Sequence, residues 1–424
     1  MGLKKLTRRQ FEAGMVMAGL SALVPGSMQA AEDDGYSTLR MHASERGLLY
    51  GCAVRPELLD LEFGHSTLNA YTRLVATQTG ILVAENAMKW RGLRPTATSF
   101  DFTQADRLMR FASENGQQVR GHNLCWHLAL PDWFAQTATK DNAAELLKTH
   151  ILTVAGRYRG QLASWDVVNE AIDPNDGRPD GLRKSPWLEL LGPGYIELAF
   201  RTAAQADPTA KLVYNDYGIE LDTREQVEKR GQVMLLIRRM KARGIPIHAV
   251  GIQGHLDASG ARPGAGLVSF VRELATLGLD VYLTELDVNT HTLEGGAEVQ
   301  DAAVAESYRQ FLGLLLNEPN VKQVLTWGIT SAYTWLNETD LAWAHRPDGM
   351  RQRPLPFDDQ LQPTAAFEAL RTSFDAAHAG VRAAQMPRES VKTGIPDPDP
   401  ATLYQPFAVP GSPGSEPLSG KQKP

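Results

Sequence analysis

The strongest constraint on the fold is a regular alternation of short apolar segments with amphipathic helical patterns. Most of the apolar segments are rich in Val, Ile, Leu or Tyr, as expected for strands that are buried on both faces. Eight strands are predicted in this way, over residues 48–54, 81–85, 118–125, 162–169, 211–216, 249–255, 280–285 and 321–328. The clearest helices are predicted over residues 103–114, 142–158, 195–206, 224–242, 267–277, 302–316 and 364–377. Strict alternation of strands and helices favours a parallel sheet.

Eight strand–helix units over roughly 330 residues predict a (β/α)8 TIM barrel of the α/β class, which forms a single domain over residues 40–380. An open, doubly wound sheet is the structural alternative. It would need a phosphate-binding cluster of glycines after the first strand. Residues 51–56, with the sequence Gly-Cys-Ala-Val-Arg-Pro, contain no such cluster.

The first 30 residues have the pattern of an export signal. A basic start is followed by an apolar stretch over residues 14–24 and by small residues near position 30. Arg8-Arg9 with Phe11 matches the twin-arginine pattern. A membrane anchor is the alternative, but the apolar stretch is short for a bilayer. We therefore expect export by the twin-arginine machinery to the periplasm or the medium, with no stable membrane association of the mature protein.

Residues 386–424 are rich in Pro, Gly, Ser and Asp and have almost no aliphatic periodicity. This composition predicts a disordered C-terminal tail. A tail that binds a partner is the alternative. The formal net charge of the whole chain is −6. Nucleic-acid binding requires a basic face, so this charge argues against it and is compatible with a neutral polymer as substrate.

Both cysteines fall on predicted strands, Cys52 on the first and Cys125 on the third. With one strand between them, the separation is about 9–10 Å. A disulfide requires Cα atoms closer than about 7 Å. We expect two buried free thiols, with a bridge as the alternative.

Two carboxylates stand at the downstream ends of predicted strands. Glu170 closes the run 164–170 and Glu285 closes the run 281–285. In a (β/α)8 barrel the carboxyl ends of the strands build the active site. Two carboxyl groups that converge there are the catalytic groups that glycoside hydrolysis requires. The alternative is a pair of solvated carboxylates without a catalytic role.

The sequence around these carboxylates resembles glycoside hydrolase family 10, most of whose members are endo-1,4-β-xylanases. The resemblance covers roughly residues 48–377, and its motifs occur in the family's order. They are Ala84-Glu85-Asn86-Ala87-Met88-Lys89-Trp90, Arg120-Gly121-His122, Trp126-His127, Leu130-Pro131, Trp165-Asp166-Val167-Val168-Asn169-Glu170, Asn215-Asp216-Tyr217, Gly251-Ile252-Gln253-Gly254-His255-Leu256, Thr284-Glu285-Leu286-Asp287-Val288 and Thr326-Trp327-Gly328-Ile329-Thr330.

The resemblance implies a retaining mechanism with Glu170 as acid/base and Glu285 as nucleophile. It also implies that His255 bonds Glu285 and that Asp287 orients His255, although a purely structural His–Asp pair is the alternative. Asn169 is implied to bond the 2-hydroxyl of the sugar. For Glu170 to deliver a proton, its pKa has to be raised, whereas Glu285 has to stay ionised.

The resemblance implies three groups of substrate-binding residues. Glu85, Asn86 and Lys89 bind the sugar two units to the non-reducing side of the cleaved bond, and Tyr217 stacks on the leaving-group side. The wall around the sugar being cleaved consists of His122, Trp126, Gln253, Trp327 and Trp335. The alternatives are ordinary core packing for the tryptophans and a surface charge for Lys89.

Several positions depart from the family's pattern. After Trp126-His127 the family usually has a polar pair that ends in Gln, but here the pair is Leu128-Ala129. Gly218 replaces a family Asn, and Ser331 replaces a frequent Asp. These departures put in doubt the strength of substrate binding, the preferred chain length and the tolerance of side groups on the polymer.

The sequence therefore predicts an exported, retaining endo-1,4-β-xylanase that acts on xylan or xylo-oligosaccharides without a metal or an organic cofactor. His122 and His127 have no nearby Cys or Asp at ligand spacing. One alternative is a related barrel hydrolase that prefers β-1,4-glucan or aryl glycosides. The other is a xylan-binding barrel without catalytic activity.

Overall fold

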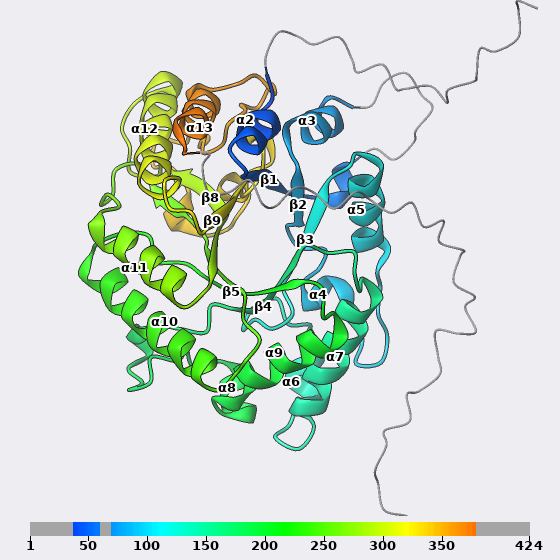
Figure 1. The fold of residues 1–424 in the computed structure, drawn as a ribbon. Helices are drawn as coiled ribbons and strands as arrows, with labels where there is room; N and C mark the ends of the chain where they lie inside the picture. The colour runs from blue at the N-terminus through cyan, green and yellow to red at the C-terminus, as the bar shows by residue number, and fades with distance from the viewer. Residues whose placement is uncertain (1–36, 60–68, 379–424) are drawn as a thin grey trace, which may run out of the picture. The chain divides into compact units, whose positions relative to one another are not determined.

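The computed structural model describes residues 37–59 and 69–378, and these form a closed parallel barrel (Figure 1). Its eight strands are β1 Leu49–Val54, β2 Ile81–Ala84, β3 Gln118–His122, β4 Ser164–Asn169, β5 Lys211–Asp216, β6 Ala249–Ile252, β8 Asp280–Asn289 and β9 Val321–Thr326. The sheet closes because β1 pairs in parallel with both β2 and β9. The predicted (β/α)8 fold is confirmed. The predicted export signal and C-terminal tail lie outside the described residues.

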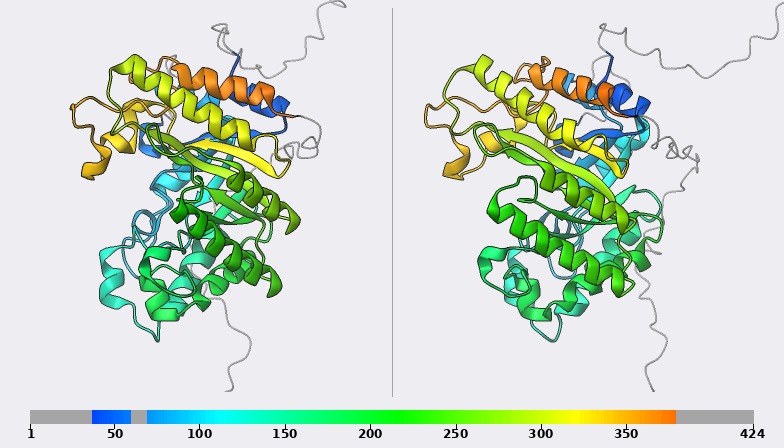
Figure 2. Two further views of the ribbon diagram at one scale, coloured as in Figure 1. Left: turned by 90° about the vertical axis from the view of Figure 1, so that its left-hand side faces the viewer. Right: turned by 60° about the vertical axis from the view of Figure 1, so that its left-hand side comes forward.

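Helices surround the strands, as both side views also show (Figure 2). The helices are α2 Leu39–Glu45, α3 Ala70–Gln78, α4 Trp90–Leu93, α5 Thr103–Glu114, α6 Asp132–Thr137, α7 Ala143–Arg157, α8 Pro186–Leu191, α9 Gly194–Ala206, α10 Arg224–Ala242, α11 Ala265–Thr276, α12 Ala297–Leu315 and α13 Ala365–Ala376. In the described part of the chain, no helix is long and apolar enough to span a bilayer.

The helical predictions match α5, α7 and α9 to α13 to within a few residues, but they miss α2, α3 and three short helices in loops. The helix α3 is short, with nine residues, and its start depends on a local cap. The Asn69 side chain accepts a hydrogen bond of 2.7 Å from the backbone N–H of Thr72. Helices of one or two turns have little apolar periodicity to detect.

The strand predicted over 249–255 is wrong at its end, and the correction matters for the site. Gly254 has a φ of +82°, a left-handed conformation that breaks the run into β6 and a short strand β7, His255–Asp257. β8 runs four residues further than predicted, to Asn289, and β7 pairs with this extension. The register places His255 directly opposite Asp287.

The barrel interior is tightly packed near the carboxyl ends of its strands. A Cβ added to Gly121 would lie 2.0 Å from the ring of Trp165. A Cβ on Gly251 would lie 2.1 Å from Oδ1 of Asn215. Cys52 and Cys125 are both buried and free.

Candidate active site

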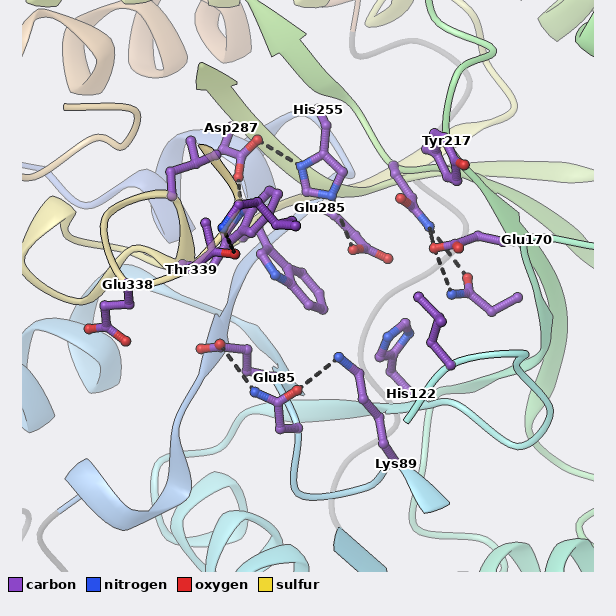
Figure 3. A pocket seen from close by; sticks show the side chains of 18 of the residues that line it. Glu85, Lys89, His122, Glu170, Tyr217, His255, Glu285, Asp287, Glu338 and Thr339 are labelled. Atoms are coloured by element: carbon purple, nitrogen blue, oxygen red, sulfur yellow. Dashed lines mark hydrogen bonds and ion pairs between the residues drawn. The ribbon is translucent and has the colours of Figure 1, made fainter. Parts of the chain in front are cut away.

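A single cavity of about 1050 Å³ opens at the carboxyl ends of the strands (Figure 3). All the side chains that the sequence singled out line it together. They are Glu85, Asn86, Lys89, His122, Trp126, Asn169, Glu170, Tyr217, Gln253, His255, Glu285, Asp287, Trp327 and Trp335. The shared cavity follows from the fold, because these residues lie in the carboxyl-terminal parts of the strands or in the loops that follow them.

Glu170 follows the last residue of β4, and its carboxylate is held by neutral donors. The Trp126 indole donates to Oε2 at 2.8 Å. Gln253 and Asn169 donate to Oε1 at 3.0 and 3.1 Å. The backbone of Glu170 has a φ of +56°, and its N–H donates to the carbonyl of Asn215 at 2.8 Å. Glu170 is only 8% exposed, and the three donors fix the direction of its carboxylate.

Burial raises the pKa of Glu170 above its ordinary value, since a charge is costly in a dry environment. The negative charges of Asp216 and Glu285 act in the same direction. The hydrogen bonds from Gln253 and Trp126 oppose the rise, because they stabilise the ionised form. The balance keeps a proton on Glu170 to higher pH than an exposed glutamate would hold it.

Glu285 lies on β8, and its partners are different in kind. Its Oε1 accepts a hydrogen bond from Asn215 at 2.8 Å. Its Oε2 lies 3.4 Å from Nε2 of His255. The other ring nitrogen of His255 lies 2.7 Å from Asp287, which also accepts 2.7 Å from the Trp335 indole. This ladder of Glu285, His255 and Asp287 depends on the pairing of β7 with β8.

The contacts within this ladder determine the protonation of His255 and Glu285. Burial opposes protonation of His255, yet the Asp287 and Glu285 carboxylates raise the pKa of His255 well above its ordinary value. Burial likewise opposes ionisation of Glu285, but the bond from His255 and the charges of His122, His255 and Lys89 lower its pKa to about 2. The imidazolium between two carboxylates therefore keeps Glu285 ionised at any moderate pH.

One end of the cavity carries Glu85, Asn86 and Lys89. Lys89 donates to Oδ1 of Asn86 at 2.9 Å, and its ammonium lies 5.0 Å from the centre of the Trp126 ring. Burial lowers the pKa of Lys89. Glu85 is paired with Arg55 at 2.8 Å. These contacts present a row of fixed polar groups to a ligand.

Tyr217 lies on the opposite side of the cavity from Glu85 (Figure 3). Its ring rests on the Lys229 ammonium, 3.8 Å from the ring centre, and Lys229 is paired with the buried Asp216. Its hydroxyl accepts 2.9 Å from Arg183, whose Nε donates 2.8 Å to the carbonyl of Glu170. The Tyr217 hydroxyl and the backbone of Glu170 thus share one guanidinium.

His122 reaches the cavity from the end of β3. Its Nδ1 lies 2.9 Å from Asp166, which also pairs with Arg120 inside the barrel. Within the described ranges, His, Cys, Asp and Glu side chains form no group of three that could hold a metal ion.

Sequence reasoning missed several residues that support this site. Asn215 stood in a recognised motif at a strand end, so its contact with Glu285 could have been anticipated. Arg55 and Arg183 give no such signal, because their contacts depend on how loops fold back on the barrel. Of the unusual pair at 128–129, Leu128 lines the cavity and is 53% exposed.

Comparisons with known proteins agree with this geometry. The sequence pattern described as "Glycosyl hydrolase family 10" matches residues 38–373. "Beta-1,4-xylanase" of Dictyoglomus thermophilum is 35% identical over 311 residues, 72% of this chain and 84% of the relative. "Exoglucanase XynX" of Acetivibrio thermocellus is 34% identical over 76% of this chain, but the match spans only 28% of that longer protein.

Among solved structures, xylanase 10B of Thermotoga petrophila RKU-1 in complex with xylobiose superposes with a TM-score of 0.71 at 31% identity. The match covers 82% of this chain and 99% of that one. Because the family pattern extends over most of the chain, including both glutamates and the whole barrel, the chain belongs to glycosyl hydrolase family 10.

Proposed function

We propose that the protein is a retaining endo-1,4-β-xylanase, with Glu170 as acid/base and Glu285 as nucleophile. The observation that carries this proposal is that two buried glutamates in one cavity have partners of different kinds, neutral donors on Glu170 and the His255–Asp287 pair on Glu285. The pKa of Glu170 is raised, whereas that of Glu285 is lowered to about 2. Glycoside hydrolysis through a covalent intermediate needs one protonated and one ionised carboxyl group at the same time.

In the first step, an oxygen of Glu285 attacks the anomeric carbon while the glycosidic bond breaks. The proton of Glu170 passes to the leaving oxygen, so the leaving sugar departs as a neutral alcohol. The products are a glycosyl ester on Glu285 and an ionised Glu170. The fixed donors on the Glu170 carboxylate, from Trp126, Gln253 and Asn169, stabilise that ionised form.

In the second step, Glu170 removes a proton from water, and the resulting hydroxide attacks the anomeric carbon and releases Glu285. The ester carries no negative charge, so one of the charges that raise the pKa of Glu170 is gone at this stage. The pKa of Glu170 therefore falls at this stage, and Glu170 is ionised when a general base is required. The cycle returns both groups to their starting protonation states.

Xylan is the proposed substrate because similar proteins are named xylanases and one similar structure contains xylobiose. The relative named an exoglucanase favours β-1,4-glucan as the second candidate. A sugar-binding barrel without turnover is disfavoured, because the complete ladder from Asp287 through His255 to Glu285 maintains a charged nucleophile.

The deciding experiment compares reducing-sugar release from linear xylan and from carboxymethyl cellulose, at equal protein concentration. Faster release from xylan is expected, and internal cleavage should lower its viscosity before much sugar is released. Faster release from cellulose would favour the glucanase alternative. Absence of release from both, with retained xylan binding, would favour the sugar-binding barrel.

We also propose that the protein is exported folded by the twin-arginine route, on the basis of Arg8-Arg9 and Phe11. Changing both arginines to Lys should leave the precursor inside the cell. Unchanged export of that variant would show that the arginine pair does not act as a signal.

A further inference from the structure

The loop between β9 and α13 carries an aromatic side chain that the proposed reaction does not use. All eight tryptophans lie in the described ranges, and Trp343 is the one that is half exposed, at 50%. It lines the rim of the cavity together with Leu341, which is 48% exposed. In both views of Figure 2 this loop, drawn in gold, projects beyond one end of the barrel. Two large apolar side chains exposed at the rim of a polar cavity are available for contact with a ligand.

Trp343 continues an aromatic wall that starts beside the nucleophile. The ring of His255 lies 5.6 Å from the ring of Trp335, and Trp335 lies 5.7 Å from Trp343. Trp335 is fixed by its bond to Asp287, so Trp343 packs against a rigid neighbour.

The planes of Trp335 and Trp343 are inclined at 69°. A flat ligand could not lie against both faces at once. A β-1,4-xylan chain twists along its length, so sugar rings at different positions of the chain can meet platforms that are inclined to each other. This geometry favours a twisted polysaccharide chain over a planar aromatic ligand.

An ion-pair clasp places this loop on the same side of the cavity as Glu85. Arg55 pairs with Glu85 at 2.8 Å and with Glu338 of the loop at 2.6 Å. It also donates 3.1 Å to the carbonyl of Tyr333. Glu338 and Thr339 lie away from Tyr217, which marks the leaving-group side (Figure 3). The clasp thus joins the loop to the glycone end, the end that holds the non-reducing part of the chain.

We propose that Trp343, with Leu341, forms an additional platform for one xylosyl unit of the same chain, beyond the sugar that Glu85 binds. Xylose has no hydroxymethyl group, so both faces of its ring present C–H groups that can stack on indole. This inference rests on the proposed xylanase function and adds a binding position to it.

The test measures kcat/KM on linear xylo-oligosaccharides from xylotriose to xylohexaose. Trp343→Ala should reduce kcat/KM on the long oligosaccharides by about threefold to tenfold, the size expected for loss of one aromatic contact. The value of kcat/KM on xylotriose should stay nearly unchanged, since three sugars fill the central positions first. Trp343→Phe should retain most of the effect of the ring. Leu235→Ala, which removes an equally exposed apolar side chain from α10, is the matched control.

A reducing-end label on xylohexaose identifies the side of the platform. Loss of a glycone platform should move cleavage toward the non-reducing end, because binding modes with many glycone sugars lose affinity. An equal loss at all chain lengths, an unchanged cleavage pattern, or a loss confined to decorated xylan would each overturn the inference. If the unaltered protein degrades xylan and Trp343→Ala has the same kinetics, the platform inference fails and the proposed function stands. If the unaltered protein leaves xylan intact, the proposed function fails.

Discussion

A glutamate lies on each of two walls of the cavity, and the two glutamates have opposite electrostatic surroundings. Glu285 faces positive charge, since His255 and Lys89 both lower its pKa. Glu170 is bonded by uncharged indole and amide groups, which fix its direction without supplying a full positive charge. Both glutamates are buried, so burial alone cannot separate them. At similar burial, charged partners favour an ionised nucleophile at Glu285, and neutral partners favour a protonated acid at Glu170.

The largest effect is expected when the ionised glutamate is removed. Glu285→Ala should reduce turnover of xylan by on the order of 10⁴-fold or more, because no covalent intermediate can form. Glu298→Ala, at an exposed position on α12, is the control and should behave like the unaltered protein. NMR of the first product from the unaltered protein should show the β-anomer. An α-anomer appearing first would refute the assignment of Glu285 as nucleophile.

Removing the protonated member should have a smaller effect that depends on the leaving group. Glu170→Ala should slow xylan cleavage by about 10²–10⁴-fold, the usual contribution of a general acid. An aryl glycoside with a good leaving group should still form the glycosyl-enzyme, and added azide should restore turnover. The kinetics of both substrates check this. Equal losses on both, with no response to azide, would count against proton donation by Glu170.

The ladder behind Glu285 can be weakened at Asp287 while Glu170 and Glu285 stay unchanged. Asp287→Asn removes a carboxylate that raises the pKa of His255, so less imidazolium remains to hold Glu285 ionised. The pKa of Glu285 should rise, and the acidic limb of the kcat/KM profile should move to higher pH. A lost hydrogen bond between charged groups, about 1.5–3 kcal/mol, corresponds to about 10- to 100-fold in rate.

The alkaline limb is the internal reference for that experiment. It follows the raised pKa of Glu170, and activity is lost as pH rises through that pKa because the acid gives up its proton. It should move little in Asp287→Asn. A shift of the alkaline limb alone would mean that the ladder acts on Glu170 instead.

The smallest expected effect concerns Arg183, which joins the Glu170 backbone to the Tyr217 hydroxyl. Arg183→Lys cannot hold both groups in the same geometry, and we expect about fivefold to tenfold lower kcat on xylan, near the value of one hydrogen bond. Aryl glycosides, which need little proton donation, should be less affected. Tyr217→Phe removes only the hydrogen bond between Arg183 and the Tyr217 hydroxyl, and it serves as the comparison. Identical losses on both substrates would indicate a general loss of structure.

The barrel and the two glutamates were predictable from sequence because strand ends carry a clear signal. An apolar run that stops at a carboxylate identifies both the strand and the mouth of the barrel. The break at Gly254 was missed, although the run 249–255 reads Ala-Val-Gly-Ile-Gln-Gly-His and a glycine inside a strand pattern signals a bend. The contacts of Arg55, Arg183 and Trp343 depend on loops that return to the barrel from distant parts of the chain. Such contacts leave no periodicity in the sequence.

Gly251 has a consequence for how this protein can change under directed evolution. Any larger residue there would place its Cβ 2.1 Å from Oδ1 of Asn215. Asn215 cannot move aside cheaply, because it is bonded to Thr284, Asn169 and Glu285. A mutational library should therefore leave position 251 unchanged and concentrate diversity in the exposed loop around residue 343, where new preferences can arise without disturbing the nucleophile.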